Sequence, residues 1–186
     1  MALKLIDISD DLLRDTSIEI DIISEGFILV KVIFNSSERE KLYSGRCNWR
    51  YYGEAEPLTF YFQKRLNVGS KPNVLAPSEL TFFVDTFHSE QSIFKQISVV
   101  YRSGLPLFEI IEATEMSDGF SFEESGGFSV EYKDEHIICF LNHLIIDEII
   151  QISELVDVLL CGGYFAGIKL KLNDYQKSKL YESTLI

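Results

Sequence analysis

Hydrophobic and polar positions alternate most clearly between residues 16 and 34. Ile18, Ile20 and Ile22 alternate with polar residues, Glu25-Gly26 has the composition of a turn, and the apolar run FILVKVIF follows. Strict alternation is typical of a strand with one buried face, and a continuous apolar run is typical of a strand buried on both faces. This stretch therefore predicts a β-hairpin with one largely buried strand.

Several further strands are expected from the same kind of pattern. Aromatic and β-forming residues dominate three segments, KLYSGRCNWRYYG (41–53), PLTFYFQKRL (57–66) and ELTFFVDTF (79–87). A second hairpin is expected at 127–142, with its turn at 133–135. The alternating IKLKL at 168–172 is typical of an edge strand guarded by lysines, and the two prolines of KPNVLAPSE predict a loop at 71–79.

Helical spacing is found mainly in the second half of the chain. Apolar residues of IIDEIIQISELVDVLL cover about half of a helical circumference, which predicts the strongest helix at about 145–161. A glycine-rich segment, CGGYFAG, would end that helix. Two more helices are expected at 89–104 and 173–183, the first with Ser89 as its N-cap and Gly104 near its C-cap. Strands first and helices later predict an α+β fold in a single domain, 1–186, and no internal repeat is visible.

The composition is that of a protein with a packed core in a reducing compartment. Of its 186 residues, 46% are hydrophobic and 13% aromatic, which argues against disorder. Cys47, Cys139 and Cys161 are odd in number and widely spaced, a pattern that fits reduced thiols better than a disulfide framework. No signal-peptide pattern and no long apolar window are present. A cytoplasmic location is therefore expected.

The net charge of −12 is concentrated in one segment. Residues 106–157 contain thirteen acidic residues and one basic residue, whereas the rest of the chain nearly balances. Such a charge repels nucleic-acid phosphates and anionic lipids and attracts cationic partners. Direct binding to nucleic acid or to a membrane is therefore not expected.

Metal-binding and catalytic patterns are weak. His136, Cys139, His143 and Asp147 would share one face of a helix, but a strand would send His136 and Cys139 to opposite faces. The sequence therefore predicts no metal and no cofactor. A small enzyme that uses His88, or His136 with His143, remains an alternative, although no catalytic motif surrounds these residues.

Acidic and aromatic residues are interleaved in the segment from 112 to 135, which has eight carboxylates and one lysine. Carboxylates attract and pair with basic side chains, and aromatic rings add buried contact area. The expected partner-binding residues are Glu112, Glu115, Asp118, Phe120, Phe122, Glu123, Glu124, Phe128, Glu131 and Tyr132.

Two interpretations of this segment stay open, a surface that only confers solubility and a surface that binds a basic protein. The leading hypothesis is a non-catalytic inhibitor of the immunity or antitoxin type, whose acidic face blocks a basic toxin such as a nuclease. A chaperone or adaptor for a secreted or phage protein is the alternative binding function.

Overall fold

The computed structural model describes residues 1–9, 16–34, 43–53, 56–65, 73–85, 95–113, 116–142 and 144–185. No helix in these ranges is long and apolar enough to cross a membrane. The elements are β1 Leu3–Ser9, β2 Thr16–Ser24, β3 Phe27–Phe34, β4 Tyr43–Tyr52, β5 Leu58–Arg65, β6 Val74–Val84, β7 Lys95–Ser103, β8 Leu105–Ile110, β9 Phe120–Ser125, β10 Phe128–Lys133, β11 His136–Leu141, β12 Ile145–Gln151, β13 Val156–Cys161, β14 Tyr164–Lys171 and α2 Asp174–Leu185.

The fold is almost entirely β, so the expected α+β class with two to three helices is wrong. All the described strands join one 14-stranded sheet, and α2 is the only helix in the described part of the chain. The main path through the sheet is β7-β12-β13-β14-β1-β8-β6-β5-β4-β9. Two hairpins branch from this path, β2-β3 at β6 and β10-β11 at β14.

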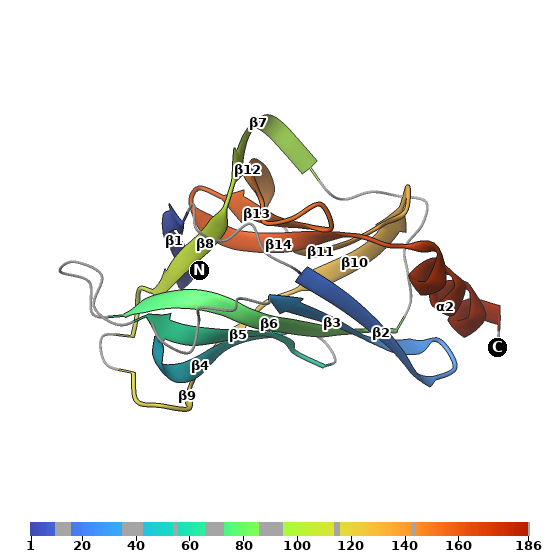
Figure 1. Cartoon of the computed structure of the whole chain (residues 1–186), viewed down its shortest axis with the longest axis horizontal. Coiled ribbons are helices and arrows are strands. Elements are labelled where there is room, and N and C mark those ends of the chain that lie inside the picture. The colour runs from blue at the N-terminus through green and yellow to red at the C-terminus, as the bar shows by residue number, and fades with distance from the viewer. Residues whose placement is uncertain are drawn as a thin grey trace.

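The sheet folds into two layers that repeat one strand order (Figure 1). In the lower layer of the figure the order is β2-β3-β6-β5-β4, and in the upper layer it is β10-β11-β14-β13-β12, with antiparallel pairing throughout. Each set ends in a parallel strand, β9 beside β4 and β7 beside β12. The chain therefore contains a repeat of topology that its sequence does not reveal.

Strands β1 and β8 connect the two layers. They pair with each other, β8 also pairs with β6, and β1 also pairs with β14. Each layer thus uses one linking strand in an equivalent position. The linking strands carry buried residues of the main core, among them Leu3, Leu107 and Phe108, so both layers contribute to one hydrophobic cluster.

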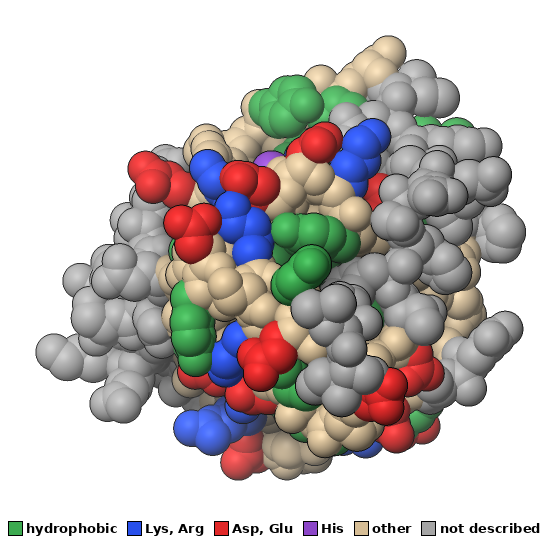
Figure 2. All heavy atoms as spheres, turned by 90° about the vertical axis from the view of Figure 1, so that its right-hand side faces the viewer, with side chains coloured by type: hydrophobic (Ala, Val, Ile, Leu, Met, Phe, Trp, Pro, Cys, Tyr) green, Lys and Arg blue, Asp and Glu red, His purple; other side chains and the backbone are tan. Residues whose placement is uncertain are grey.

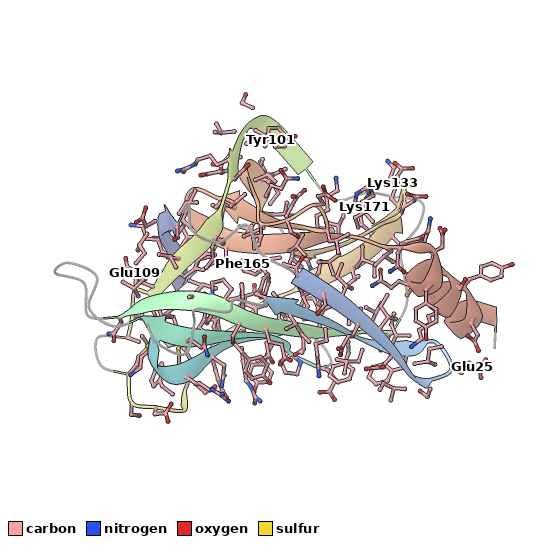
Figure 3. The ribbon with its side chains drawn as sticks, viewed as in Figure 1. Glu25, Tyr101, Glu109, Lys133, Phe165 and Lys171 are labelled. Atoms are coloured by element: carbon pink, nitrogen blue, oxygen red, sulfur yellow. The ribbon has the colours of Figure 1, made fainter. Side chains whose placement is uncertain are left out.

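An aromatic cluster fills the space between the layers. Phe60 lies 4.4 Å from Phe62, 5.2 Å from Phe165 and 5.9 Å from Phe108, measured between ring centroids. Trp49 meets Phe165 edge to face at 5.6 Å. Phe165 belongs to the upper layer and points toward the lower one (Figure 3), so these contacts join strands from both halves. Such aromatic pairs add to the stabilisation that burial of the rings provides.

The strongest expected helix, at about 145–161, is in fact the two strands β12 and β13. Strand β12 is buried on both faces, because Ile150 belongs to the main core while Ile146 and Ile149 belong to a second cluster on the outer side of the upper layer. A register irregularity between Ile146 and Glu148 shifts the alternation of faces. The resulting spacing of three and four between buried residues imitates a helix.

Three other local expectations also need correction. Part of the helix expected at 89–104 is strand β7, and residues 89–94 lie outside the described residues. Within the loop expected at 71–79, Val74 begins β6, and Pro77 lies in that strand beside a register irregularity, where a proline is tolerated. Strand β14, which contains most of IKLKL, is not an edge strand, because it pairs with β13, β11 and β1.

Several expectations are confirmed. The hairpins β2-β3 and β10-β11 have the expected positions, with turns at Gly26 and at Asp134-Glu135. Gly162-Gly163 turns the chain, although it joins β13 to β14 and ends no helix; both glycines have positive φ, 57° and 83°. Two consecutive residues with positive φ are what a tight hairpin turn requires.

The expected C-terminal helix is also present as α2. It lies along the hairpin β2-β3 (Figure 1) and anchors there through buried Leu180. Gln176 Nε2 donates to the carbonyl of Ile18 at 2.7 Å, and Lys179 Nζ donates to that of Ile20 at 3.1 Å. These alternate carbonyls lie on the edge of β2 that no described strand covers, so α2 satisfies part of that edge.

Candidate partner-binding surface

The ten expected partner-binding residues are distributed among several environments. Strand β9 pairs in parallel with β4, and its side chains alternate between half-buried Phe120, Phe122 and Glu124 and exposed Ser121, Glu123 and Ser125. Glu115 lies outside the described residues.

The four expected aromatic residues pack against the core. Phe120, Phe122, Phe128 and Tyr132 are half-buried and contact the main hydrophobic cluster. Phe128 also lies over Gly53, where an added Cβ would approach its ring to 3.0 Å. The rings therefore belong to the hydrophobic core as well as to any binding surface. Their alternation with polar residues along the sequence could have indicated this.

Glu124 makes hydrogen bonds and an ion pair within the protein. Its Oε2 accepts hydrogen bonds from the indole Nε1 of Trp49 at 2.7 Å and from the backbone N–H of Ala2 at 3.3 Å. Its Oε1 lies 3.3 Å from the N-terminal ammonium. Burial and the nearby Glu124 carboxylate raise the pKa of Tyr51. Glu131 is only 4% exposed. The carboxylates of Glu124 and Glu131 are therefore less available to a partner than the sequence predicts.

Three expected residues, Glu112, Asp118 and Glu123, are exposed. Asp118 accepts the backbone N–H of Arg46 at 2.8 Å, which fixes the turn before β9 against β4. Glu112 lies near the same end of the molecule, because the neighbouring Ile111 donates its N–H to the carbonyl of Ala2, next to Glu124. These three carboxylates make no ion pair with another described residue.

A surface that the sequence analysis missed adjoins these acids. It is the outward face of β4, β5 and β9, here called the β4–β9 face, and its members are Arg46, Asn48, Arg50, Tyr52, Tyr61, Ser121 and Glu123. On β4 these residues alternate with buried Cys47 and Trp49. The alternation of Arg, Asn, Arg and Tyr in the sequence was the signal that could have identified it.

Hydrogen bonds connect the side chains of the β4–β9 face. Bonds to Tyr52, and to a smaller extent to Tyr61, raise the pKa of Arg50. Tyr52 donates its hydroxyl to Glu123 at 3.3 Å, and Ser121 donates to Asn48 at 2.6 Å. The face is therefore a connected polar layer that holds both signs of charge.

The remaining acids of the 106–157 segment lie on other parts of the molecule. Glu135 pairs with Lys177 at 2.7 Å and Glu148 pairs with Arg102. Asp147 accepts the N–H of Gly162 at 3.1 Å. Acidic and basic side chains are interspersed on the end of the molecule that faces the viewer in Figure 2. The acidic segment thus does not fold into one continuous acidic face.

The residues considered for metal binding or catalysis do not form a site in the described structure. Cys139 is fully buried, and burial raises the pKa of its thiol. His136 is near the surface, with Nδ1 2.7 Å from the carbonyl oxygen of Asp134, and His88 and His143 lie outside the described residues. Among the described residues, no three His, Cys, Asp or Glu side chains are grouped as metal ligands would be.

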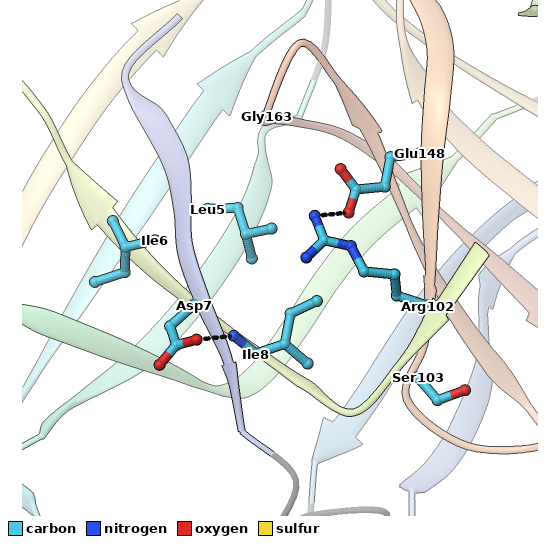
Figure 4. Close-up of a pocket in the computed structure, with 8 residues that line it drawn as sticks. All are labelled: Leu5, Ile6, Asp7, Ile8, Arg102, Ser103, Glu148 and Gly163. Atoms are coloured by element: carbon cyan, nitrogen blue, oxygen red, sulfur yellow. Dashed lines mark hydrogen bonds and ion pairs between the residues drawn. The ribbon is translucent and has the colours of Figure 1, made fainter. Parts of the chain in front are cut away.

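One open depression of about 460 Å³ lies between β1 and the end of β7 (Figure 4). Leu5 and Ile8 line one side, and the ion pair of Arg102 with Glu148 lies opposite them. Glu148 neutralises the guanidinium, so the remaining charge among the lining residues is the exposed carboxylate of Asp7, which accepts the backbone N–H of Ile8 at 2.8 Å.

The fold and its surfaces define a two-layer β protein with a polar sheet face at one end. The sequence matches no protein-family model and has no significant match among curated proteins.

Proposed function

We propose that this chain is a non-catalytic binding protein that recognises a basic protein through the β4–β9 face and the exposed acids beside it. The particular form we favour is an inhibitor of the immunity or antitoxin type. The observation that supports this proposal most is the face itself, where Arg50, Tyr52 and Tyr61 lie side by side with Glu123. Tyrosine and arginine are the residues that dominate binding energy in protein interfaces.

The electrostatic part of the proposal depends on Glu112, Asp118 and Glu123. They are exposed and make no ion pair with another described residue, so their charges are available to a partner. Such carboxylates accelerate encounter with a cationic surface and choose among partners, more than they add affinity. The two arginines on the same face, Arg46 and Arg50, would pair with acidic groups at the edge of the partner's basic patch.

The proposal is tested with the purified partner, which we expect a neighbouring reading frame to encode. The test variant is Glu112→Lys with Glu123→Lys, and the matched control is Glu19→Lys with Glu182→Lys, two exposed acids on β2 and α2. Association is measured by surface plasmon resonance at low and high salt. We expect the test variant to associate about tenfold more slowly at low salt, with a much smaller effect at high salt.

A second pair of variants examines the uncharged part of the β4–β9 face. Tyr52→Ala and Tyr61→Ala should each accelerate dissociation of the complex, because they remove aromatic contact area from the β4–β9 face. Equal association rates for the test and control charge variants, together with unchanged dissociation of both tyrosine variants, would show that the partner binds elsewhere.

A further inference from the structure

The outward side of the lower layer is one continuous surface from β9 to β3. Side chains of directly paired residues on neighbouring strands lie on the same face of a sheet. The pairing of β9, β4, β5, β6 and β3 forms unbroken rows on this side. One row contains, in order, Ser121, Asn48, Tyr61, Glu79 and Ile33, and another contains Glu123, Arg50, Thr59, Thr81 and Lys31. The β4–β9 face therefore continues over β6 and β3 without a break.

The part of this surface that lies on β3 and β6 is apolar. Leu29 lies opposite Phe83, and Phe27 stacks on Phe83 with the ring centroids 5.2 Å apart and the planes within 7°. All three side chains are half-buried and alternate along their strands with residues of the main core, so they face outward. Phe27, Leu29 and Phe83 are here called the apolar patch.

No buried cluster of the described chain covers the apolar patch. On the outward side of the upper layer, Ile138, Phe140 and their neighbours form a second hydrophobic cluster. Among the described residues, the outward side of the lower layer has no such cluster, and its apolar side chains stay half-buried. The two layers therefore differ on their outward sides, and only the lower one presents apolar contact area beside a polar face.

A stable interface needs more surface than the β4–β9 face provides. A standard protein interface involves roughly 20–30 residues on each side, far more than this face contains. With neighbouring strands about 4.8 Å apart, the face is about 10 Å wide across β9, β4 and β5, and including β6 and β3 extends it to about 20 Å. Interfaces combine an apolar centre with a polar rim. The β4–β9 face is polar, and the apolar patch supplies the apolar part.

The charges beside the apolar patch suit a basic protein. Lys31 is paired with Glu79 at 3.8 Å, so this pair adds no net charge to the surface. Asp85 follows directly after β6, is exposed and makes no ion pair within the described part of the chain. Its carboxylate is available at the apolar end of the surface, as that of Glu123 is at the polar end. Carboxylates at both ends attract a protein whose contact surface carries basic side chains.

We propose that the basic partner covers the surface from β9 to β3 and places an apolar side chain on the apolar patch. This inference rests on the proposed function, because it assigns a further contact to the same partner on the same side of the molecule. Strand β2, which carries the control residue Glu19, lies beyond the proposed contact area. The partner should therefore present an apolar residue beside its basic patch.

The first test removes the apolar contact. The probe is the purified protein encoded by the neighbouring reading frame, and dissociation is measured by surface plasmon resonance. Leu29→Ala and Phe83→Ala should each accelerate dissociation at least about fivefold and leave the association rate nearly unchanged. The matched control is Ile145→Ala, an exposed apolar residue on β12, which should dissociate as wild type does. Urea unfolding of each variant shows that it is folded in the assay.

The second test leaves the apolar core untouched. Exchanging the two partners of the surface ion pair, Lys31→Glu with Glu79→Lys, keeps the pair and the net charge of the chain, so long-range attraction is unchanged. The exchange inverts the local charge pattern and should accelerate dissociation if the partner contacts β3 and β6. The control exchanges Glu135 with Lys177, an ion pair of 2.7 Å between the β10–β11 turn and α2, and should have no effect.

Hydroxyl-radical labelling of the wild-type complex gives a reading that needs no variant, since Phe27 and Phe83 should be labelled less in the complex than in the free chain. If Tyr52→Ala and Tyr61→Ala accelerated dissociation while the patch variants and the exchanged pair did not, and labelling of Phe83 stayed the same, the contact would end at β5. The present inference would then be wrong and the proposed function would stand. If none of these variants changed binding, the proposed function itself would be refuted.

Discussion

The stability of Glu124 variants tests whether this residue supports the fold or is available to bind a partner. Its carboxylate accepts the indole N–H of Trp49, a residue that is only 1% exposed. In Glu124→Ala the indole N–H would stay buried without an acceptor. A hydrogen bond to a charged group contributes about 1.5–3 kcal/mol, and the Ala2 N–H loses the same acceptor. We expect Glu124→Ala to lower the free energy of unfolding by about 2–3 kcal/mol.

Two further variants calibrate this number. Glu124→Gln keeps an oxygen that can accept from Trp49 and loses only the pairing with the N-terminal ammonium, so its loss should stay below about 1 kcal/mol. Glu123→Ala, the exposed neighbour, should change stability by less than about 0.5 kcal/mol.

The assay is urea unfolding followed by tryptophan fluorescence, which reports on this site directly because Trp49 is the single tryptophan. With a slope of about 2 kcal/mol per molar urea, Glu124→Ala should lower the midpoint by about 1 M. If Glu124→Ala unfolded at the same urea concentration as Glu123→Ala, the carboxylate would not support Trp49. Glu124 would then rejoin the residues available to a partner.

Two further outcomes follow from burial. Burial raises the pKa of the Asp157 carboxyl above its value in the unfolded chain, and Lys169 and His136 partly oppose this shift. The protonated carboxyl therefore stabilises the fold at pH values below the unfolded pKa. This contribution is lost as the pH rises through the folded pKa. Asp157→Asn should therefore gain stability relative to wild type between pH 3 and pH 7 in urea titrations, and a pH-independent difference would contradict this. Cys47 is 2% exposed and burial raises its pKa to about 12, Cys139 is fully buried, and Cys161 is half-buried. A thiol reagent such as DTNB should label one cysteine in the native protein and three in urea, and rapid labelling of a second native thiol would show that the core opens.

Strand-by-strand prediction succeeded where one face of a strand is polar. The alternation of Ile18, Ile20 and Ile22, and the turn at Asp134-Glu135, identify hairpins from local chemistry alone. It failed where both faces are buried. In β12 the pattern of Ile146, Ile149 and Ile150 results from two separate hydrophobic clusters, and a sequence window cannot distinguish that from one helical face.

The candidate site was predictable only in part for a related reason. Glu112, Asp118 and Glu123 are exposed as a polar composition would indicate. Glu124 and Glu131 lie in the same acidic segment of the sequence, but they face inward because of their strand positions and their long-range neighbours. The bond from Trp49 to Glu124 joins residues 75 positions apart, and the parallel pairing of β9 with β4 that brings them together has no local signal.

The repeated topology explains why function should reside at the edges of this sheet. The two layers have the same strand order, so the inner faces of both layers form the core in the same way. The edges of the two layers differ in their side chains. Strand β2 is covered by α2, its counterpart β10 is not covered by a described helix, β9 is acidic, and β7 is apolar. An acidic edge repels acidic chains and attracts basic ones. We therefore expect a basic partner to bind at the end of the sheet that carries β9, beside the β4–β9 face.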